Sequence, residues 1–203
     1  KNPARGIVGP KRSRPLPQFL REGEMDRLLD EVPVGESYRD LLAYTIVLTF
    51  YSTGMRLAEL VGLTDDSIDF GARVIKVLGK GSKQRLIPFA DELEAGLKAY
   101  IARRDAEVAR CDKAFFVDQR GERVKRGAVQ NSVRASLAKV TSMKKRSPHV
   151  LRHSFATAML NNDAGLESVK KLLGHESLST TEIYTHTTFE QLRKIYDKAH
   201  PRA

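Results

Sequence analysis

The sequence has 203 residues, of which 41% are hydrophobic and 30% are charged. This length suits one domain with a sizeable core, and the composition excludes a wholly disordered chain. Lysine and arginine number 35 against 25 acidic residues, a net charge of +10 that favours a polyanionic partner such as DNA, RNA or an anionic membrane surface.

Cys111 is the single cysteine, which excludes an intrachain disulfide and fits a reducing compartment. No apolar run approaches the roughly 20 residues that a membrane-spanning helix needs, and no signal-peptide pattern is recognisable. We therefore expect a cytoplasmic protein without a membrane-spanning helix, and among its possible polyanionic partners we favour nucleic acid over a membrane.

Residues 1–19 are rich in proline, glycine, lysine and arginine, a composition that disfavours both helix and sheet. We predict an extended basic linker here, ahead of one domain that spans residues 20–203. Its cations would suit a segment lying along a phosphate backbone, and we expect DNA contacts from Lys11, Arg12 and Arg14. A disordered tail is the alternative.

Apolar residues then recur at helical spacing from Leu20 to just before Pro33, which predicts a first helix. A second helix is expected over residues 37–53. It is apolar on most faces, so we expect it to be buried. Gly54 ends it, and a short helix starts at Arg56.

Residues 67–89 change to the pattern of β-strands, with two β-rich runs on either side of a Gly-rich turn at 79–84. This pattern predicts a hairpin. Helices are expected at about 91–109 and 127–139, with a short strand at 115–117 between them.

The last third of the sequence is mostly helical. One helix begins after Ser147, whose hydroxyl can serve as the N-cap, and the next ends at Gly174. A capping-box pattern at 179–182 begins a short helix that carries Tyr184. The sequence therefore predicts a mainly α domain with a small antiparallel β-sheet, an α+β fold.

A cluster of polar residues lies at the start of the helix that follows Ser147. His149, Arg152 and His153 are spaced so that one helix face presents all three near the helix N-terminus, where anions are favoured. The pattern indicates a phosphate or carboxylate pocket. A surface arginine beside a packed histidine is the simpler alternative. A zinc site would need further ligands, which the single cysteine and the absence of an HExxH motif do not supply.

The other candidate functional residues carry little weight when each is taken alone. Arg56 with Glu59 could be an ordinary pair on a helix surface, and Lys80 between two glycines could be an ordinary turn lysine. Tyr184 has histidines nearby in sequence, at 175 and 186. A phenol with a pKa near 10 is a poor nucleophile at neutral pH, so it would need neighbouring cations or a base.

Together these segments resemble the tyrosine recombinase family, and specifically its bacterial Xer branch, which resolves chromosome dimers. The similarity extends from the linker to the last residues, 200–203. The segments that carry it are Thr53-Gly-Met-Arg56-Leu-Ala-Glu59-Leu60, Gly79-Lys80-Gly81-Ser-Lys83-Gln-Arg85, Ser147-Pro-His149-Val-Leu-Arg152-His153, Leu172-Leu-Gly-His175 and Thr180-Thr-Glu-Ile-Tyr184-Thr-His186.

The resemblance implies that Tyr184 is the nucleophile and that Arg56 and Arg152 hold the scissile phosphate. Lys80 resembles the hairpin lysine that protonates the leaving 5′-oxygen, and Lys83 is its rival at the same turn. Arginine suits phosphate because its planar fork of donors keeps its charge.

The remaining site residues are also implied by the resemblance. His149 would assist proton transfer near the nucleophile, and His175 would donate to a phosphate oxygen. Glu59 would orient Arg56 or a neighbouring group. DNA contacts are expected from Lys83 and Arg85.

The family fold and activity follow as expectations. The enzyme would cleave and rejoin DNA through a 3′-phosphotyrosine and a Holliday junction, without ATP, metal or cofactor. Its partners would be a double-stranded recombination site, like subunits in a homo- or heterotetramer, and a DNA translocase. Family members carry an N-terminal core-binding domain, which we expect this sequence to lack, so that it is a catalytic fragment. Residues 187–203 resemble a segment that docks onto a neighbouring subunit. We also expect Tyr184 to be withdrawn until DNA is bound.

Three alternatives stay open. A mobile-element integrase of the same family would share these motifs. A type IB topoisomerase uses similar phosphotyrosine chemistry but joins no second site. A non-catalytic DNA-binding protein would explain the charge, although it has no use for the hairpin lysine and the tyrosine.

Overall fold

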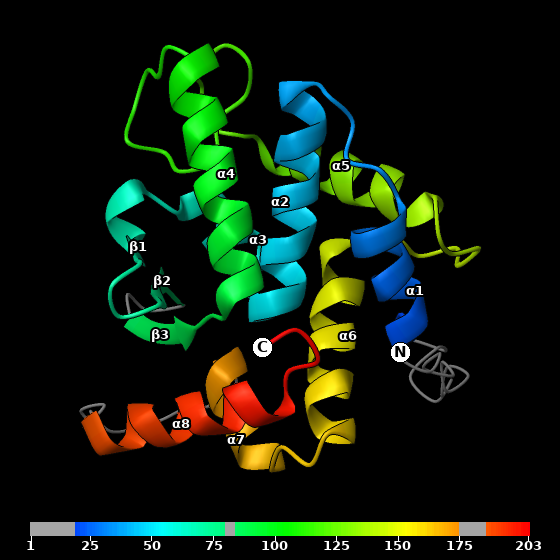
Figure 1. Cartoon of the computed structure of the whole chain (residues 1–203), viewed down its shortest axis with the longest axis vertical. Coiled ribbons are helices and arrows are strands. Elements are labelled where there is room, and N and C mark those ends of the chain that lie inside the picture. The colour runs from blue at the N-terminus through cyan, green and yellow to red at the C-terminus, as the bar shows by residue number, and fades with distance from the viewer. Residues whose placement is uncertain (1–18, 80–83, 175–185) are drawn as a thin grey trace, which may run out of the picture.

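The computed structural model describes residues 19–79, 84–174 and 186–203 (Figure 1). Helices dominate this part of the chain and a small antiparallel sheet lies at one side, so the predicted α+β class is confirmed. No helix in the described ranges is long and apolar enough to cross a membrane. In chain order, the helices are α1 (Glu22–Asp26), the π-helical turn η1 (Arg27–Glu31), α2 (Tyr38–Thr53), α3 (Leu57–Gly62), the 3-10 turn η2 (Asp65–Ser67), α4 (Asp91–Glu107), α5 (Arg126–Ala138), α6 (Pro148–Asn161), α7 (Leu166–Leu173) and α8 (His186–Ala199).

Helix α2 is the central element, and it packs against α4, α5 and α6 (Figure 1). Its residues Ile46, Val47, Leu48 and Phe50 are at most 1% exposed. A helix that is apolar all round must be enclosed, because each such side chain gains about 1.5–3 kcal/mol when it leaves water. The prediction of a buried second helix is therefore confirmed.

The sheet has three strands in the order β1 (Ile68–Asp69), β2 (Val74–Leu78) and β3 (Gln84–Pro88), all antiparallel. Strands β2 and β3 form the predicted hairpin, whose tip at residues 80–83 lies outside the described residues. The predicted strand at 115–117 is wrong. That segment is buried, but it makes only isolated bridges at Ala114 and Val117.

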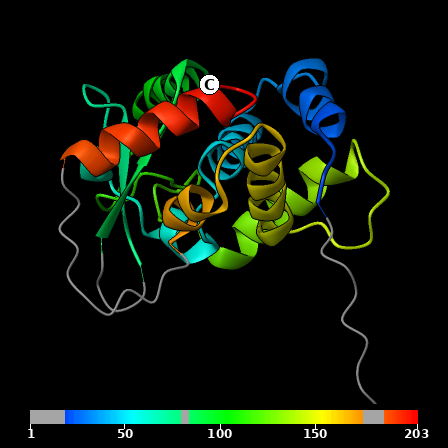
Figure 2. The ribbon, with the colours of Figure 1, turned by 90° about the horizontal axis from the view of Figure 1, so that it is seen from below.

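Helix α8 packs against α6, α7 and β3, and Figure 2 shows it lying across one side of the molecule. Its Tyr196 is fully buried, and the hydroxyl donates to the carbonyl of Ser52 at 3.0 Å. The predicted docking of residues 187–203 onto a neighbouring subunit concerns an assembly and stays a prediction. Within this chain, the second half of α8 and the turn after it pack against the chain's own α2 and α6.

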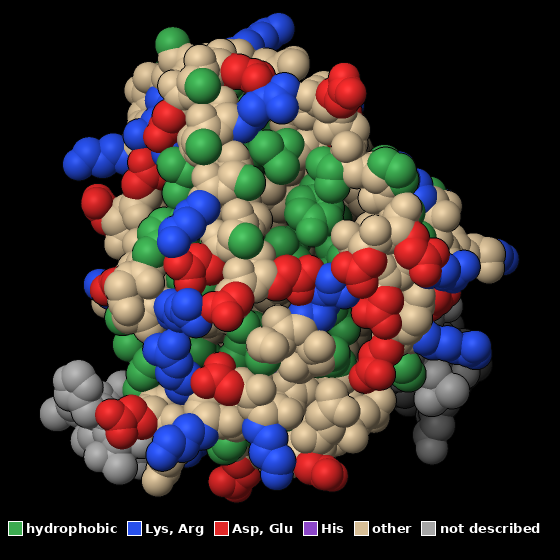
Figure 3. Space-filling view, viewed as in Figure 1, with side chains coloured by type: hydrophobic (Ala, Val, Ile, Leu, Met, Phe, Trp, Pro, Cys, Tyr) green, Lys and Arg blue, Asp and Glu red, His purple; other side chains and the backbone are tan. Residues whose placement is uncertain are grey.

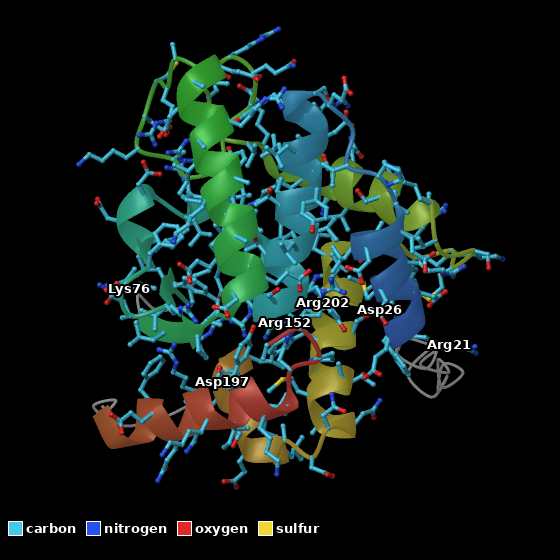
Figure 4. The ribbon with its side chains drawn as sticks, viewed as in Figure 1. Arg21, Asp26, Lys76, Arg152, Asp197 and Arg202 are labelled. Atoms are coloured by element: carbon cyan, nitrogen blue, oxygen red, sulfur yellow. The ribbon has the colours of Figure 1, made fainter. Side chains whose placement is uncertain are left out.

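Arg202 fastens the C-terminal turn to two distant parts of the chain. Its guanidinium forms ion pairs with Asp26, Asp30 and Glu92, which come from α1, η1 and α4. Figure 4 labels Arg202 and Asp26 where the C-terminal turn approaches α1, and Figure 3 shows charges of both signs intermixed on this face. The hydrogen bond from Arg202 lowers the pKa of Asp30. Several carboxylates around one planar guanidinium make this a network rather than an isolated surface pair.

His200 lies between the aromatic rings of Tyr51, Phe155 and Tyr196 and is 4% exposed. Its Nδ1 accepts from the backbone N–H of Arg202, so the proton of the neutral ring is on Nε2, which donates to the carbonyl of Tyr51 at 3.3 Å. The pKa of His200 is lowered to about 4, mainly by burial. The hydrogen bond to Tyr51 raises this pKa, and the positive charge of Arg202 lowers it.

We expect His200 to make the protein less stable in mild acid. The unfolded chain binds a proton near pH 6.5, whereas the folded ring resists it until about pH 4. The stability that the neutral His200 ring contributes is therefore complete above pH 6.5. As the pH falls from 6.5 to 4, the free energy of unfolding decreases by about 1.4 kcal/mol for each pH unit. Urea unfolding of wild type and His200→Phe from pH 4.5 to 7.5 measures this. Equal pH slopes in the two proteins would contradict it, because carboxylates titrate in both.

Candidate active site

Helix α6 presents the polar cluster that the sequence predicted. Pro148 is its first residue, and Ser147 occupies the N-cap position, but the Ser147 hydroxyl makes no capping hydrogen bond within the described residues. His149 and His153 are exposed, whereas Arg152 is only 8% exposed. The arginine therefore reaches inward, while the histidines face the solvent.

Two main-chain carbonyls hold the Arg152 guanidinium. Its Nη1 donates to the carbonyl of Gly54, at the end of α2, and its Nη2 donates to the carbonyl of Leu173 at 2.7 Å. Figure 4 labels Arg152 where α2, α6 and α7 come together. The last carbonyls of a helix lack partners within it and carry partial negative charge, which suits a buried cation.

Gly54 makes the junction between α2 and the next element possible. Its φ of 58° is left-handed, and a Cβ there would lie 2.5 Å from Phe155 and 2.8 Å from Leu173. Glycine adopts this conformation without steric cost, so the predicted helix end is confirmed. The tight turn brings Arg56 beside α6.

Arg56 is the N-cap residue of α3, and its side chain is 38% exposed. Its backbone N–H donates to Glu59 at 2.6 Å, and its Nη1 donates to the same carboxylate at 3.0 Å. Its Nη2 donates to the carbonyl of Gly174 at 2.9 Å. The predicted pairing of Glu59 with Arg56 is therefore present, and Glu59 itself is buried.

Arg85 lies on β3 next to this pair and does not fit the prediction of a DNA contact. Its side chain is 7% exposed, and all three guanidinium nitrogens donate within the protein. Two of them bind the Glu59 carboxylate, and Nε binds the carbonyl of Leu172 at 3.0 Å. A guanidinium that is buried, bound at each nitrogen within the protein and absent from the pocket lining is not presented to a phosphate in this conformation.

The local charge is positive. Arg56, Arg85 and Arg152 lie around one carboxylate, Glu59. Burial alone would raise the pKa of Glu59, but hydrogen bonds and charge from Arg85 and Arg56 outweigh it and the pKa is lowered. Burial, with the charges of Arg56 and Arg85, lowers the pKa of Arg152 to about 10, so it stays protonated at neutral pH. Such a cluster favours a bound anion.

An open pocket of about 360 Å³ adjoins these side chains, lined by Arg56, Leu57, Ala58, Arg126, His149, Arg152, His153, Ala156 and Leu173. It is large enough for a small polar group and carries donors on several sides. Three arginines and two histidines can present N–H groups to an anion there. Among the described residues, no group of three or more His, Cys, Asp or Glu could hold a metal ion.

The structure therefore brings together four of the predicted site residues, Arg56, Glu59, His149 and Arg152. Lys80, Lys83, His175 and Tyr184 lie outside the described residues, as do the predicted linker contacts Lys11, Arg12 and Arg14. Their roles, and the prediction that Tyr184 is withdrawn without DNA, stay predictions.

Two polar residues that line the pocket were not among the predicted site residues. Arg126 begins α5, and His153 follows Arg152. In the sequence, His153 shares the polar helix face with His149 and Arg152, whereas Arg126 has no signal beyond being a cation at the start of a predicted helix. Its place in the pocket depends on how α5 packs against α3, which is a long-range contact.

Comparisons with known proteins identify the family of this chain. The phage integrase family matches residues 18–191. Tyrosine recombinase XerC of Psychromonas ingrahamii is 42% identical over 205 residues, covering all of this chain and 67% of the relative. Tyrosine recombinase XerC of Shewanella oneidensis is 40% identical, covering all of this chain and 65% of the relative. The chain thus spans about two thirds of the length of these relatives.

Solved structures show the same fold. The XerA recombinase is 31% identical with a TM-score of 0.71, over 94% of this chain and 68% of that chain. The XerH site-specific recombinase, solved with its palindromic difH substrate after cleavage, is 26% identical with a TM-score of 0.73, over 94% and 56%. The family match and the identities of about 40% over its whole length show that this chain belongs to the phage integrase family, as a tyrosine recombinase of the Xer type.

Proposed function

We propose that this chain is the catalytic part of a site-specific recombinase that cuts and rejoins double-stranded DNA through a 3′-phosphotyrosine at Tyr184. The observation that carries the proposal is the open pocket at which Arg56 and Arg152 are anchored on main-chain carbonyls. A phosphodiester is an anion whose two non-bridging oxygens match two adjacent guanidinium groups.

In the proposed cleavage step, the Tyr184 oxygen attacks phosphorus, and the bond from phosphorus to the 5′-oxygen breaks. Lys80 gives a proton to that oxygen, which leaves as a hydroxyl rather than an alkoxide. Arg56 and Arg152 donate to the non-bridging oxygens, where negative charge grows in the transition state. Because carbonyls already hold both guanidinium groups, little reorganisation is needed during the reaction.

The histidines serve proton transfer and phosphate binding. His149 lines the pocket and is exposed, which leaves its ring free to accept the tyrosine proton. His175 donates to a phosphate oxygen. The phosphotyrosine conserves the energy of the broken bond, so a 5′-hydroxyl from a second duplex can attack it and release Tyr184. Two such exchanges pass through a Holliday junction and need neither ATP nor a metal.

The DNA is proposed to continue from the pocket along α5. Arg126, Gln130 and Arg134 are exposed and recur every fourth residue, so they share one face of this helix. Arg126 lines the pocket, and Gln130 lines an adjoining hollow together with His149. A basic helix face that runs on from a phosphate pocket suits a duplex backbone.

The biological setting follows from the chemistry and from the relatives. The curated relatives are named XerC, and the XerH structure contains a recombination site. The proposed substrate is therefore a chromosomal recombination site, bound by like subunits in a tetramer and used in chromosome dimer resolution. Because that substrate is the chromosome, we propose a cytoplasmic location.

The decisive experiment uses a nicked suicide substrate that carries a recombination site. Loss of the short fragment after cleavage traps the protein on DNA, and a denaturing gel detects the adduct. Digestion and mass spectrometry should then find the phosphate on the peptide that contains Tyr184.

Phosphate on a different side chain would contradict the assignment of Tyr184. Salt-sensitive DNA binding without any adduct would instead favour a non-catalytic DNA-binding protein.

A further inference from the structure

The end of α7 contacts three arginines from three other elements. The carbonyls of Leu172, Leu173 and Gly174 accept from Arg85, Arg152 and Arg56, respectively, at 3.0, 2.7 and 2.9 Å. These consecutive carbonyls lie in the last turn of the helix and at its C-cap, where no intrahelical partner is available. The three guanidinium groups thus take the place of the missing helix hydrogen bonds.

Arg85 differs from the other two arginines because it does not line the pocket. On strand β3, Arg85 and Ile87 point to the same face of the sheet, and both are buried. The Arg85 guanidinium packs against Gly174, where a Cβ would lie 3.2 Å from it. Arg85 therefore points from β3 toward α3 and α7, and it is buried behind the residues that line the pocket.

Glu59 is fully engaged by its two arginine partners. Its Oε1 accepts from Nη1 of Arg56 and Nη1 of Arg85, and its Oε2 accepts from the backbone N–H of Arg56 and Nη2 of Arg85. The fork of Arg85 approaches both oxygens at once, which fixes the rotation of the carboxylate. The orientation of Glu59 in turn fixes the Arg56 side chain.

We propose that Arg85 is a positioning residue for phosphate binding, which holds Arg56 in place through Glu59 and ties α7 to the β2–β3 hairpin. The proposal rests on the proposed function for its effect on cleavage. Arg85 pairs with Val77 across the hairpin, and His175 follows Gly174 directly in the sequence. Figure 2 shows the ends of β2 and β3 that flank residues 80–83 on the same side of the molecule as the C-terminal end of α7.

The test replaces Arg85 with lysine, which keeps the charge but has one ammonium group in place of a fork. We expect Arg85→Lys to form the covalent adduct about 10- to 100-fold more slowly at saturating DNA, because Arg56 is displaced. Its DNA affinity and the salt dependence of binding should match those of wild type. Glu59→Gln should also slow adduct formation. The double variant should form the adduct as fast as the more impaired of the two single variants, because the two residues act as one unit.

Arg104→Lys is the matched control. Arg104 is 1% exposed and binds a carboxylate, Asp65, and a main-chain carbonyl, that of Phe115, but it does not line the pocket. We expect it to lower the unfolding temperature while adduct formation changes by less than about threefold, since distant sites act independently.

A second measurement does not depend on cleavage. The ¹⁵N relaxation of the Arg56 side-chain Nε–H should report a rigid group in wild type and in Arg104→Lys, and a mobile one in Arg85→Lys. If wild type forms no adduct, the proposed function fails, and this measurement still decides whether Arg85 positions Arg56.

Three results would overturn the proposal. The first is cleavage by Arg85→Lys at the wild-type rate. The second is an equal loss of cleavage in Arg104→Lys. The third is weaker DNA binding by Arg85→Gln, which removes the charge, with a salt slope reduced by about one, because that change marks a direct phosphate contact.

Discussion

Arg152→Lys is expected to slow covalent adduct formation about 10³-fold at saturating DNA, because it removes a preorganised donor pair from the transition state. One ammonium group cannot bind the carbonyls of Gly54 and Leu173 and also present donors to a phosphate. Burial would lower the pKa of a lysine at this position further, so part of the charge would be lost. The measurement is single-turnover cleavage of the suicide substrate.

The matched control is Arg123→Lys. Arg123 also donates to two main-chain carbonyls, those of Val61 and Leu63, but it does not line the pocket. The Arg123→Lys variant should cleave the suicide substrate at close to the wild-type rate. DNA affinity of Arg152→Lys should stay within about tenfold of wild type, because many phosphate contacts share the binding energy. Cleavage by Arg152→Lys within tenfold of wild type would refute its role at the scissile phosphate.

Gly54→Ala is expected to lower the free energy of unfolding by about 2–5 kcal/mol, combining the cost of a left-handed alanine with that of overpacking. The new methyl group would meet Phe155 at 2.5 Å and Leu173 at 2.8 Å. Phe155 lies on the same helix as Arg152, and the carbonyls of Leu173 and Gly54 both bind that arginine. We therefore expect slower cleavage as well, even at temperatures where the variant is folded. Urea unfolding and the adduct assay measure the two effects.

Gly62→Ala tests whether these losses come from the position rather than from the methyl group. Gly62 is the last residue of α3, its φ is not left-handed, and an added Cβ would have no atom within 4 Å. Alanine favours the helix, so the variant should be as stable as wild type or more stable by up to about 1 kcal/mol. Equal destabilisation by both substitutions would contradict the steric argument for Gly54.

Much of the fold could be predicted because the decisive signals are local. An all-round apolar run predicted the buried helix α2, and a Gly-rich turn between two β-rich runs predicted the hairpin of β2 and β3. The strand expected at residues 115–117 was wrong because a strand needs a partner, and no propensity within the segment supplies one. The first helix was predicted as one element, but it continues from α1 into a π-helical turn.

The candidate site was predicted only in part, because some of its signals are local in the sequence and others are not. Arg56, Glu59, His149 and Arg152 lie in two motifs whose spacing is visible in the sequence, and the structure brings the two motifs together. Arg85 was predicted to contact DNA because it lies in a segment that resembles the family's hairpin motif. Which way it faces depends on Glu59, 26 residues away, and on Leu172, 87 residues away. No local pattern reports such partners.

The sequence by itself determined the class of the fold, the helix ends at Gly54 and Gly174, and the motifs that identify the family. Tertiary structure alone decided which cations are available to a ligand. Arg56 and Arg152 line the pocket with Arg126, whereas Arg85 is enclosed behind them. The physical reason is that guanidinium groups satisfy their donors on whichever carbonyls and carboxylates the packed chain brings near. For Arg152, one of those carbonyls lies 98 residues away, at Gly54.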